Sequence, residues 1–314
     1  MENHFAVKLS AALRRCGNPV LVGLDPRAES LPAGMLASDD VERPERVAAA
    51  FGEFCRGVID VVAPLVPAVK PQAAFFEQQG PAGMVVLAEV IAHARSQGLL
   101  VILDGKRNDI GSTATAYAHA YLGPVEQHGW GADALTVSPY LGEDSLEPFV
   151  EVAMDHGGGV FVLVKTSNPG GGRFQDLVAD GRPLYAHVGE LVQQLAQRTL
   201  PDASSGCLYG SIGAVVGATY PEQLHQLRQS LPNCWLLVPG FGAQGGGAAE
   251  VASAFDEEGL GAIVNSSRGI IFAHSQDRYR DKFGDAGWQQ AVEAATRDMI
   301  GQLREHTPAG QLTS

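Results

Sequence analysis

The sequence is poor in the features that mark nucleic-acid-binding, membrane and secreted proteins. Only 22 of its 314 residues are Lys or Arg, against 35 Asp or Glu, and the formal net charge is -13. Nucleic acids and anionic membranes bind clustered positive charge, so neither is expected as a main partner. There is no run of about 18 apolar residues to span a membrane, and no N-terminal apolar stretch of signal-peptide length. A small phosphorylated ligand stays compatible with this charge, because a phosphate site needs only a few local cations.

Cysteine and histidine patterns exclude other kinds of site. The four cysteines, Cys16, Cys55, Cys207 and Cys234, are widely separated and form no C-x-x-C pair. This spacing favours reduced, mostly buried thiols in a cytoplasmic protein over a disulfide framework. The nine histidines show no H-E-x-x-H or similar spacing, so no metal site is expected. No motif suggests nicotinamide, flavin or pyridoxal phosphate, so no cofactor is expected.

Short apolar runs alternate with longer amphipathic stretches along the chain. Each run is continuously apolar, as expected for parallel strands that are buried on both faces. Strands are predicted over residues 19–24, 67–70, 99–104, 133–137, 160–165, 212–216, 235–239 and 261–265. Helices are predicted between them, over residues 45–63, 81–97, 112–127, 143–156, 184–199, 221–231, 247–257 and 286–304, with an extra helix over 3–15.

This order of elements predicts an α/β fold, a single (β/α)8 TIM barrel with an extra N-terminal helix. One domain would occupy residues 1–305, and residues 306–314 are expected to be a disordered tail. An open, doubly wound sheet stays an alternative, because alternation alone does not show closure. Two segments, 26–44 and 168–183, are longer than usual barrel loops. Both follow predicted strands and are expected at the C-terminal face, where barrel active sites lie.

Charged residues gather at the predicted ends of the first three strands. The stretch VILDGKRNDIGSTA ends a buried strand in Asp104 and Lys106, with Asp109 a short turn later. Residues two apart in a strand point the same way, so Asp104 and Lys106 are expected to project together. Lys70 ends the second strand in VVAPLVPAVK, and Asp25 ends the first in LVGLDP. Each alone would be interpreted as a salt-bridge residue, but their gathering at one face favours a catalytic site.

Glycine-rich loops follow the seventh and eighth predicted strands, as GFGAQGGG and SSRG. Barrels often bind phosphate with the loops after these two strands, through backbone N–H groups that glycine lets a ligand approach. Arg268 offers a bidentate partner for phosphate, and Gln244 lies in the first loop. Tight turns alone would explain the glycines, but these two side chains favour a phosphate site.

The stretch VILDGKRNDIGSTA resembles the signature of the orotidine 5′-phosphate decarboxylases. It satisfies every position of that signature, an apolar strand followed by D-x-K-x-x-D, Ile, Gly or Pro, any residue and Thr. The resemblance covers most of the chain, including LDP, VKPQAAFFEQQG, TSNP, VPGFGAQGG and NSSRGI, whose wording is similar to the longer bacterial subtype. It implies a cytoplasmic lyase without metal or cofactor. Such an enzyme converts orotidine 5′-monophosphate to UMP and CO2, the last step of de novo pyrimidine biosynthesis.

The resemblance also implies catalytic roles. Lys106 would stabilise the carbanion at C6 of the pyrimidine and then protonate it as general acid. Asp104 would lie near the departing carboxylate. Lys70 and Asp109 would complete an alternating chain, Lys70–Asp104–Lys106–Asp109.

Further residues are implied to bind substrate or a second subunit. Asp109, Ile110 and Thr113 would reach the neighbouring site, which implies a homodimer. The remaining contacts would be Asp25 and Lys70 with the ribose, Ser167 with the pyrimidine, Gln244 with phosphate and base, and Arg268 with the phosphate.

Three alternatives stay open. Keto-gulonate phosphate decarboxylase and hexulose phosphate synthase share D-x-K-x-x-D, but they use Mg²⁺ and resemble one another in having an acid where this chain has Lys70. A Schiff-base aldolase would use Lys165, at the end of the fifth predicted strand, although an ion-paired or solvent-facing Lys165 is favoured. The third alternative is a nucleotide-binding barrel that has lost activity, but all four charged positions are intact.

Overall fold

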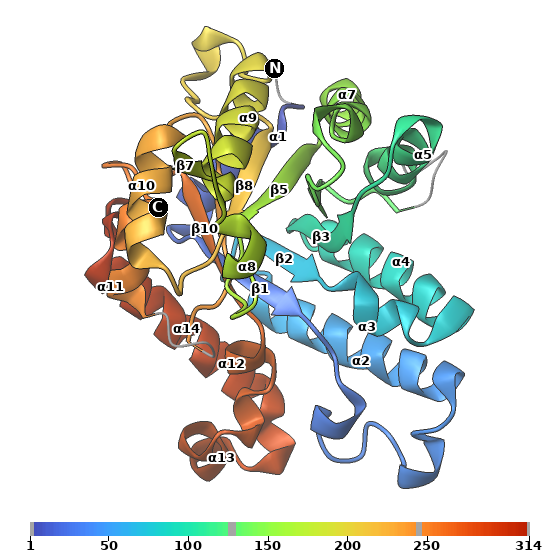
Figure 1. The fold of residues 1–314 in the computed structure, drawn as a ribbon. Helices are drawn as coiled ribbons and strands as arrows, with labels where there is room; N and C mark the ends of the chain where they lie inside the picture. The colour runs from blue at the N-terminus through green and yellow to red at the C-terminus, as the bar shows by residue number, and fades with distance from the viewer. Residues whose placement is uncertain (1–2, 125–129, 243–246, 313–314) are drawn as a thin grey trace.

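Parallel strands form a closed barrel in the computed structural model, which describes residues 3–124, 130–242 and 247–312 (Figure 1). Around the barrel the strands follow the order β1-β10-β9-β8-β5-β4-β3-β2. They are β1 (Val20–Leu24), β2 (Ala68–Pro71), β3 (Leu100–Arg107), β4 (Ala134–Val137), β5 (Gly159–Lys165), β8 (Ile212–Val216), β9 (Leu236–Val238) and β10 (Ala262–Ser266). The pairing of β1 with β10 closes the sheet. The predicted (β/α)8 barrel is therefore confirmed, and the open sheet is excluded.

Helices connect the strands and surround the barrel (Figure 1). The longer ones are α1 (Phe5–Cys16), α2 (Pro44–Val62), α4 (Gly80–Ser96), α5 (Gly111–Leu122), α7 (Glu147–His156), α9 (Leu184–Arg198), α10 (Pro221–Ser230) and α14 (Trp288–His306). The shorter ones are α3 (Ala73–Glu77), α8 (Gly172–Gln175), α11 (Ala248–Val251), α12 (Arg268–Ile271) and α13 (Asp277–Phe283). The helix predicted over 247–257 is thus limited to α11 and one following 3-10 turn, and residues 125–127 of another predicted helix lie outside the described residues.

Helix α1 is the extra N-terminal helix and packs against the N-terminal end of β5. Its apolar stripe of Phe5, Leu9 and Leu13 is fully buried. The Phe5 ring lies edge-on to Phe161, with 5.9 Å between the ring centroids. Gly159 begins β5, and an added Cβ there would lie 2.3 Å from the Phe5 ring. A glycine is therefore needed where the helix covers this end of the barrel, which we term the barrel floor.

The barrel interior is a packed core. Every residue of β1, β8 and β10 is buried, as expected for parallel strands covered on both faces. Phe161 of β5 packs against Gly213 of β8, where an added Cβ would lie 2.7 Å from the phenyl ring. A large and a small residue thus pack together across these two neighbouring strands, as in the filled interiors of such barrels.

The C-terminal segment differs from the prediction of a disordered tail over 306–314. Residues Pro308–Gln311 form a 3-10 helix, and the Thr307 side chain caps it by accepting the Ala309 N–H at 3.1 Å. Ala309 and Leu312 are buried in the main core. The prediction was wrong through Leu312, because two apolar side chains in a polar segment are enough to dock it. Residues 313–314 lie outside the described residues.

Segment 168–183, here called the second insertion, is ordered. It contains α8 and an antiparallel hairpin of β6 (Val178–Ala179) and β7 (Arg182–Pro183). The hairpin turns through Asp180 and Gly181, which both have positive φ angles of 49° and 75°. Figure 1 places α8 beside the C-terminal ends of the barrel strands. This insertion is therefore in position to contribute to a site at that face.

All four cysteines are free thiols. Cys55 and Cys234 are buried, and Cys16 and Cys207 are half-buried. Burial raises the pKa of the Cys234 thiol to about 12, so it stays protonated at neutral pH. The prediction of unpaired cysteines is confirmed, although only two of the four are fully buried. Within the described ranges, none of the helices is both long and apolar enough to cross a membrane.

Candidate active site

A cavity of about 640 Å³ opens at the C-terminal ends of the barrel strands. Its polar side is formed by Lys70, Asp104, Lys106 and Thr136, which come from β2, β3 and β4. Apolar residues of β5, β8 and β9 face them, and the second insertion adds a third wall. These further lining residues are Leu163, Val215, Leu237, Pro239, Thr166, Ser167, Asn168, Gly170, Gly171, Phe174 and Gln175. Of the charged residues predicted at this face, Lys70, Asp104 and Lys106 therefore lie in one wall of the cavity, and Asp25 and Asp109 are not among its lining residues in the described structure.

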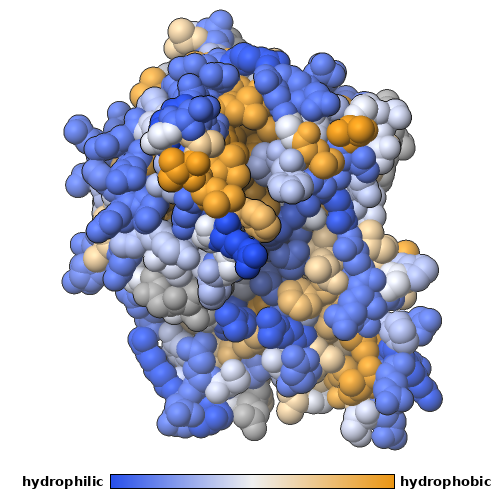
Figure 2. Space-filling view, viewed as in Figure 1, coloured by the Kyte–Doolittle hydropathy of each residue, from blue (hydrophilic) through white to orange (hydrophobic). Residues whose placement is uncertain are grey.

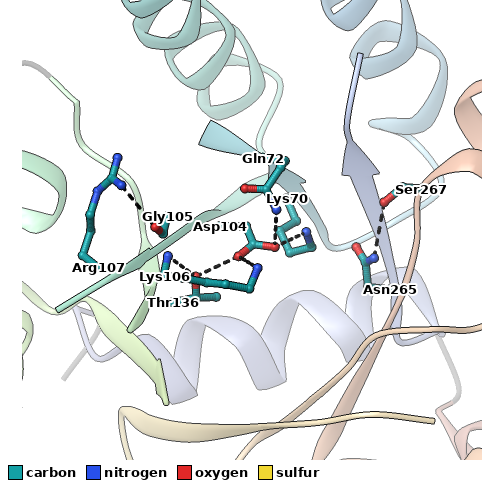
Figure 3. A network of polar contacts seen from close by, with 9 residues as sticks. All are labelled: Lys70, Gln72, Asp104, Gly105, Lys106, Arg107, Thr136, Asn265 and Ser267. Carbon is teal, nitrogen blue, oxygen red and sulfur yellow. Dashed lines mark hydrogen bonds and ion pairs between the residues drawn. The ribbon is translucent and has the colours of Figure 1, made fainter. Parts of the chain in front are cut away.

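Asp104 is the centre of the polar wall, and four side chains point toward it (Figure 3). Its Oδ2 accepts hydrogen bonds from Lys70 Nζ at 2.7 Å and from Gln72 Nε2 at 3.0 Å. Its Oδ1 accepts hydrogen bonds from Lys106 Nζ at 2.6 Å and from Thr136 Oγ1 at 2.9 Å. The expectation that Asp104 and Lys106 project together is confirmed. A carboxylate has about four lone-pair sites, so these donors fill its capacity.

Burial and neighbouring charges shift the pKa values of Asp104 and Lys70 in opposite directions. Asp104 is 6% exposed and Lys70 is 4% exposed. Burial alone would raise the pKa of Asp104, but the adjacent Lys70 and Lys106 hold that pKa well below its usual range. Burial alone would lower the pKa of Lys70, but Asp104 and Asp25 raise it. Both buried groups are consequently charged at neutral pH.

Lys106 is held in an unusual backbone conformation. Its φ angle is 45°, in the left-handed region that side-chain-bearing residues seldom adopt. The register between β3 and β4 shifts between Leu103 and Arg107, so Lys106 lies in a bulge. Its backbone N–H donates to Thr136 Oγ1 at 2.9 Å, which fixes the bulge to β4. The side chain, 47% exposed, extends along the cavity wall toward Asp104.

Arg107 ties the end of β3 to the surrounding helices. Its guanidinium pairs with Glu77 of α3 and donates to the Tyr121 hydroxyl of α5 at 3.1 Å. The guanidinium also lies over the rings of Tyr117 and Tyr121, at 5.8 and 5.4 Å from their centroids. The residue that follows Lys106 is thus anchored on both sides, which limits movement of the bulge.

Two buried acceptors lie on the adjacent strands β1 and β10. Asp25 follows β1, and Asn265 lies near the end of β10. Within the described residues, Asp25 Oδ1 and Asn265 Oδ1 are buried and have no hydrogen-bond partner. Gly23 leaves room mainly for Ser267, because an added Cβ would lie 1.9 Å from the Ser267 Oγ and 3.1 Å from the Asn265 Oδ1. Buried acceptors without a donor are costly, so both oxygens are candidates for contact with a ligand.

Asp109, Ile110 and Thr113, which follow Lys106, are not among the residues that line the cavity in the described structure. Asp109 Oδ1 accepts the Ile110 N–H at 2.9 Å, and no ion pair joins Asp109 to Lys106 in the described structure. Ile110 is 55% exposed, and Thr113 is also exposed. Within one subunit the predicted alternating chain therefore consists of Lys70, Asp104 and Lys106 only.

Of the residues predicted at the base and phosphate, the structure describes Ser167 and Arg268. Ser167 lies in the cavity wall. Arg268 is the first residue of α12, directly after β10, and is exposed. Gly240 and Gly242, in the loop after β9, have φ angles of 98° and 74°, which glycine adopts without strain. Gln244 lies outside the described residues.

Sequence reasoning missed Gln72, Thr136 and Asn265. A signal existed for Gln72, because it lies two residues after Lys70 and strand alternation brings such residues to one face. Thr136 is the single hydroxyl in an apolar strand, and Asn265 is the single carboxamide in another. Polar side chains in otherwise apolar barrel strands were the signal that those two positions carried.

Lys165 forms an ion pair, which is one of the two roles that the sequence analysis favoured over that of a Schiff-base lysine. Its Nζ pairs with Asp176, and the side chain is 1% exposed. It is not among the residues that line the cavity in the described structure. A role as a Schiff-base lysine in this cavity is therefore not supported.

The sequence and fold of this chain are similar to those of known proteins. The sequence matches the orotidine 5′-phosphate decarboxylase / HUMPS family over residues 18–279. An orotidine 5′-phosphate decarboxylase from Rhodopirellula baltica is 59% identical over 302 residues, which cover 96% of this chain and 99% of that protein. One from Haloarcula marismortui is 42% identical over 305 residues, covering 96% of this chain and 100% of that protein.

A solved structure shows the same fold. The Leishmania donovani OMP decarboxylase has a TM-score of 0.72 to this chain at 32% sequence identity, and the match covers 96% of this chain and 98% of that one. Family, relatives and solved structure thus match nearly the whole barrel, including the strands that carry Lys70, Asp104 and Lys106. From this agreement it follows that the chain belongs to the orotidine 5′-phosphate decarboxylase / HUMPS family.

Proposed function

We propose that this chain is a carboxy-lyase that converts orotidine 5′-monophosphate to UMP and CO2, the last step of de novo pyrimidine biosynthesis. The names of its relatives support the reaction. The observation that carries the mechanism is the contact of Lys106 Nζ with Asp104 Oδ1 at 2.6 Å in the cavity wall. It places a proton donor and a fixed negative charge side by side.

Lys106 acts on the carbanion in this mechanism. The bond between C6 and the carboxylate carbon breaks, and its electron pair stays on C6 while CO2 leaves. A cation fixed beside C6 stabilises the transition state more than the substrate, which lowers the barrier. Lys106 Nζ then gives a proton to C6, which forms UMP. Solvent returns a proton to Lys106 for the next turnover.

Asp104 has two roles in the proposal. Its four hydrogen bonds fix the carboxylate, and the carboxylate in turn fixes Lys106. Its negative charge also faces the substrate carboxylate, and this repulsion disappears when CO2 departs. The lowered pKa of Asp104 keeps that charge present at neutral pH.

The reaction in this proposal needs neither a metal ion nor an organic cofactor. The donors on Asp104 occupy the lone pairs that a cation would otherwise use. The sugar-phosphate enzymes of this barrel group resemble one another in an acid at the position of Lys70. A buried ammonium group at that position repels Mg²⁺.

Substrate contacts are assigned around the same cavity. The buried Oδ1 of Asp25, with Lys70 beside it, accepts a ribose hydroxyl. Ser167, in the cavity wall, contacts the pyrimidine. Arg268 and Gln244 bind the phosphate, and Gln244 also contacts the base. These assignments rest on the resemblance together with the positions of the described residues.

The assembly in this proposal is a cytoplasmic homodimer in which Asp109, Ile110 and Thr113 reach the partner's cavity. The loop that carries them leaves Ile110 55% exposed. Tyr140 and Leu141, after the adjacent strand β4, are 82% and 46% exposed. Such an exposed apolar group is typical of a surface that a second subunit covers.

The test is an absorbance assay with orotidine 5′-monophosphate in the presence of EDTA, with wild type and Lys106→Ala compared. Turnover to UMP that survives EDTA and is lost in the variant supports the proposal. Turnover that requires Mg²⁺, or no turnover, contradicts it and makes keto-gulonate 6-phosphate the next substrate to assay. Binding of UMP without any turnover would indicate an inactive nucleotide-binding barrel.

A further inference from the structure

We propose that Lys165 is a positioning residue that holds the second insertion as a wall of the cavity, and thereby sets affinity for the base end of the nucleotide. This inference rests on the function proposed above. The mechanism uses Lys70, Asp104 and Lys106 and leaves Lys165 without a role. A fully buried lysine needs a structural or functional reason, because its charge is costly to bury.

A bulge in β5 turns Lys165 away from the cavity. Leu163 lines the cavity, so regular alternation would also point Lys165 into it. The register with β8 instead pairs Leu163 with Val215 and Lys165 with Val216, which leaves Val164 as an extra residue. Bulges re-aim side chains in this way. Lys165 consequently faces the surrounding helices and not the barrel interior.

The Lys165 ammonium group is enclosed by one carboxylate and two aromatic rings. It pairs with Asp176, which follows α8 in the second insertion. Its Nζ lies 4.7 Å from the ring centroid of Tyr220 and 5.4 Å from that of Tyr185. Tyr185 belongs to α9 and Tyr220 precedes α10, so the insertion is attached to two outer elements of the barrel. Cation–π contacts of this kind are stronger when the cation is desolvated.

A second anchor lies one residue away from Asp176. Gln175 Oε1 accepts the Thr166 N–H at 3.0 Å, and Gln175 Nε2 donates to Thr166 Oγ1 at 2.8 Å. The chain from Thr166 to Asp176 is therefore a loop whose two ends are joined. Ser167 lies inside this loop and contributes to the cavity wall.

The wall that this loop forms packs tightly against the strand end at Ser167, but it is exposed to solvent at Phe174. Gly217, after β8, has no room for a side chain, because an added Cβ would lie 2.8 Å from Ser167 Cβ. At the other point, Phe174 lines the cavity but remains 59% exposed. Figure 2 shows apolar side chains on this face, beside a hollow, in the region where Figure 1 places α8 and β7. The exposed Phe174 adds little buried apolar contact, so the Lys165–Asp176 pair and the Gln175–Thr166 hydrogen bonds are the polar contacts that attach the loop to β5.

The experiment compares Lys165→Met and Asp176→Ala with wild type. We expect the Kd of UMP and the KM of orotidine 5′-monophosphate to rise about tenfold in both variants, because the wall beside the base is released. The value of kcat at saturation should stay within about threefold, since Lys106 and Asp104 are untouched. Ribose 5-phosphate lacks the base, so its inhibition constant should change less than about twofold. A loss of packing alone would weaken both ligands.

Matched controls make each outcome decisive. Arg198 lies on α9, the helix that also carries Tyr185, and forms an outward-facing pair with Glu147 of α7. Arg198→Met breaks this pair and should leave UMP affinity unchanged. If Lys165→Met does not fold, Asp176→Ala still carries the test, because the Asp176 side chain is 51% exposed. Unchanged UMP affinity in a folded variant, or equal weakening of ribose 5-phosphate, overturns the inference. Wild type that neither binds UMP nor turns over orotidine 5′-monophosphate overturns the proposed function instead.

Discussion

Asp104 links the charge balance of the cavity to the stability of the barrel. It pairs with the buried Lys70 on one oxygen and with Lys106 on the other. Removing one partner of such a buried pair leaves an uncompensated charge, which typically costs about 3–5 kcal/mol. A residue proposed for catalysis is therefore also expected to be among the more important for folding.

The pH dependence of stability follows from two opposite pKa shifts. The lowered pKa of Asp104 means that its ion pairs stabilise the fold above its ordinary value of 3.8 and lose this contribution as pH falls through the lower, folded-state value. The raised pKa of Lys70 means that its contribution is present below its ordinary value of 10.5 and is lost as pH rises through the higher, folded-state value. The full contribution is therefore expected between about pH 5 and pH 9.

Urea unfolding of wild type and Asp104→Asn at a series of pH values measures this contribution. The difference in free energy of unfolding should stay constant from about pH 5 to pH 8 and become smaller below about pH 4. A difference that grows in acid would contradict the ionised state of Asp104.

Thr136 is expected to act through the groups it holds. Thr136→Val keeps the shape of the side chain but removes the donor to Asp104 and the acceptor of the Lys106 N–H. We expect kcat to fall about 10- to 100-fold with little change in KM, because displacement of a reacting group by about 1 Å costs this much. Thr136→Ser should retain most activity.

A matched control for this variant is Thr296→Val. Thr296 is also fully buried and donates to the Val292 carbonyl within α14. The Thr296→Val variant should have a lower free energy of unfolding than wild type but an unchanged kcat. Equal kinetic effects at the two positions would reject a positioning role for Thr136.

Individual contacts differ in how far the sequence predicts them. The meeting of Asp104 with Lys106 follows from strand alternation, and the same rule would have placed Gln72 beside Lys70. Thr136 depends on the register between β3 and β4, which no local pattern encodes. In our proposal, Asp109 contacts the cavity of a second copy of the chain. Its contacts are therefore not determined by the sequence and fold of one subunit.

At the scale of elements, two bulges decide where the important lysines point. Strand periodicity predicted both strands, yet it does not reveal the extra residues of the bulges, which number two on β3 opposite β4 and one on β5 opposite β8. Lys106 turns toward the cavity with a φ angle of 45°, and Lys165 turns away from it. Short helices such as α3 and α12 were missed for a related reason, since four or five residues are too few to establish a helical period.

The docked C-terminal segment gives a prediction about stability. Leu312 is 4% exposed, and Leu312→Ala should lower the free energy of unfolding by about 2–3 kcal/mol through loss of buried apolar contact. The exposed neighbour Gln311 provides the control, since Gln311→Ala should change it by less than about 0.5 kcal/mol. Urea denaturation measures both. Equal, small effects would mean that the segment contributes nothing to the fold in solution.

At the scale of the whole molecule, the proposed dimer divides each site between two chains. Lys106→Ala and Asp109→Ala should each be nearly inactive alone. After denaturation and joint refolding of an equal mixture, half of the dimers are mixed, and one of the two sites in each mixed dimer is intact. Activity should then return to about a quarter of that of wild type.

This complementation has a clear control and a clear contradiction. Refolding each variant by itself should restore nothing, because every site then lacks the same residue. If the mixture also stays inactive although mixed dimers form, Asp109 does not act across the interface. If Asp109→Ala is fully active alone, the resemblance does not extend to this position.

The packed barrel interior and helix α1 affect the route by which small molecules enter and leave the cavity. Phe5 and Phe161 are buried and pack edge to face at the barrel floor, so side chains fill the end of the barrel opposite the cavity at this point. In the proposed reaction, the nucleotide and carbon dioxide therefore both pass through the cavity opening beside the second insertion. A compound that binds in this opening would block both substrate entry and product release without contacting Lys106.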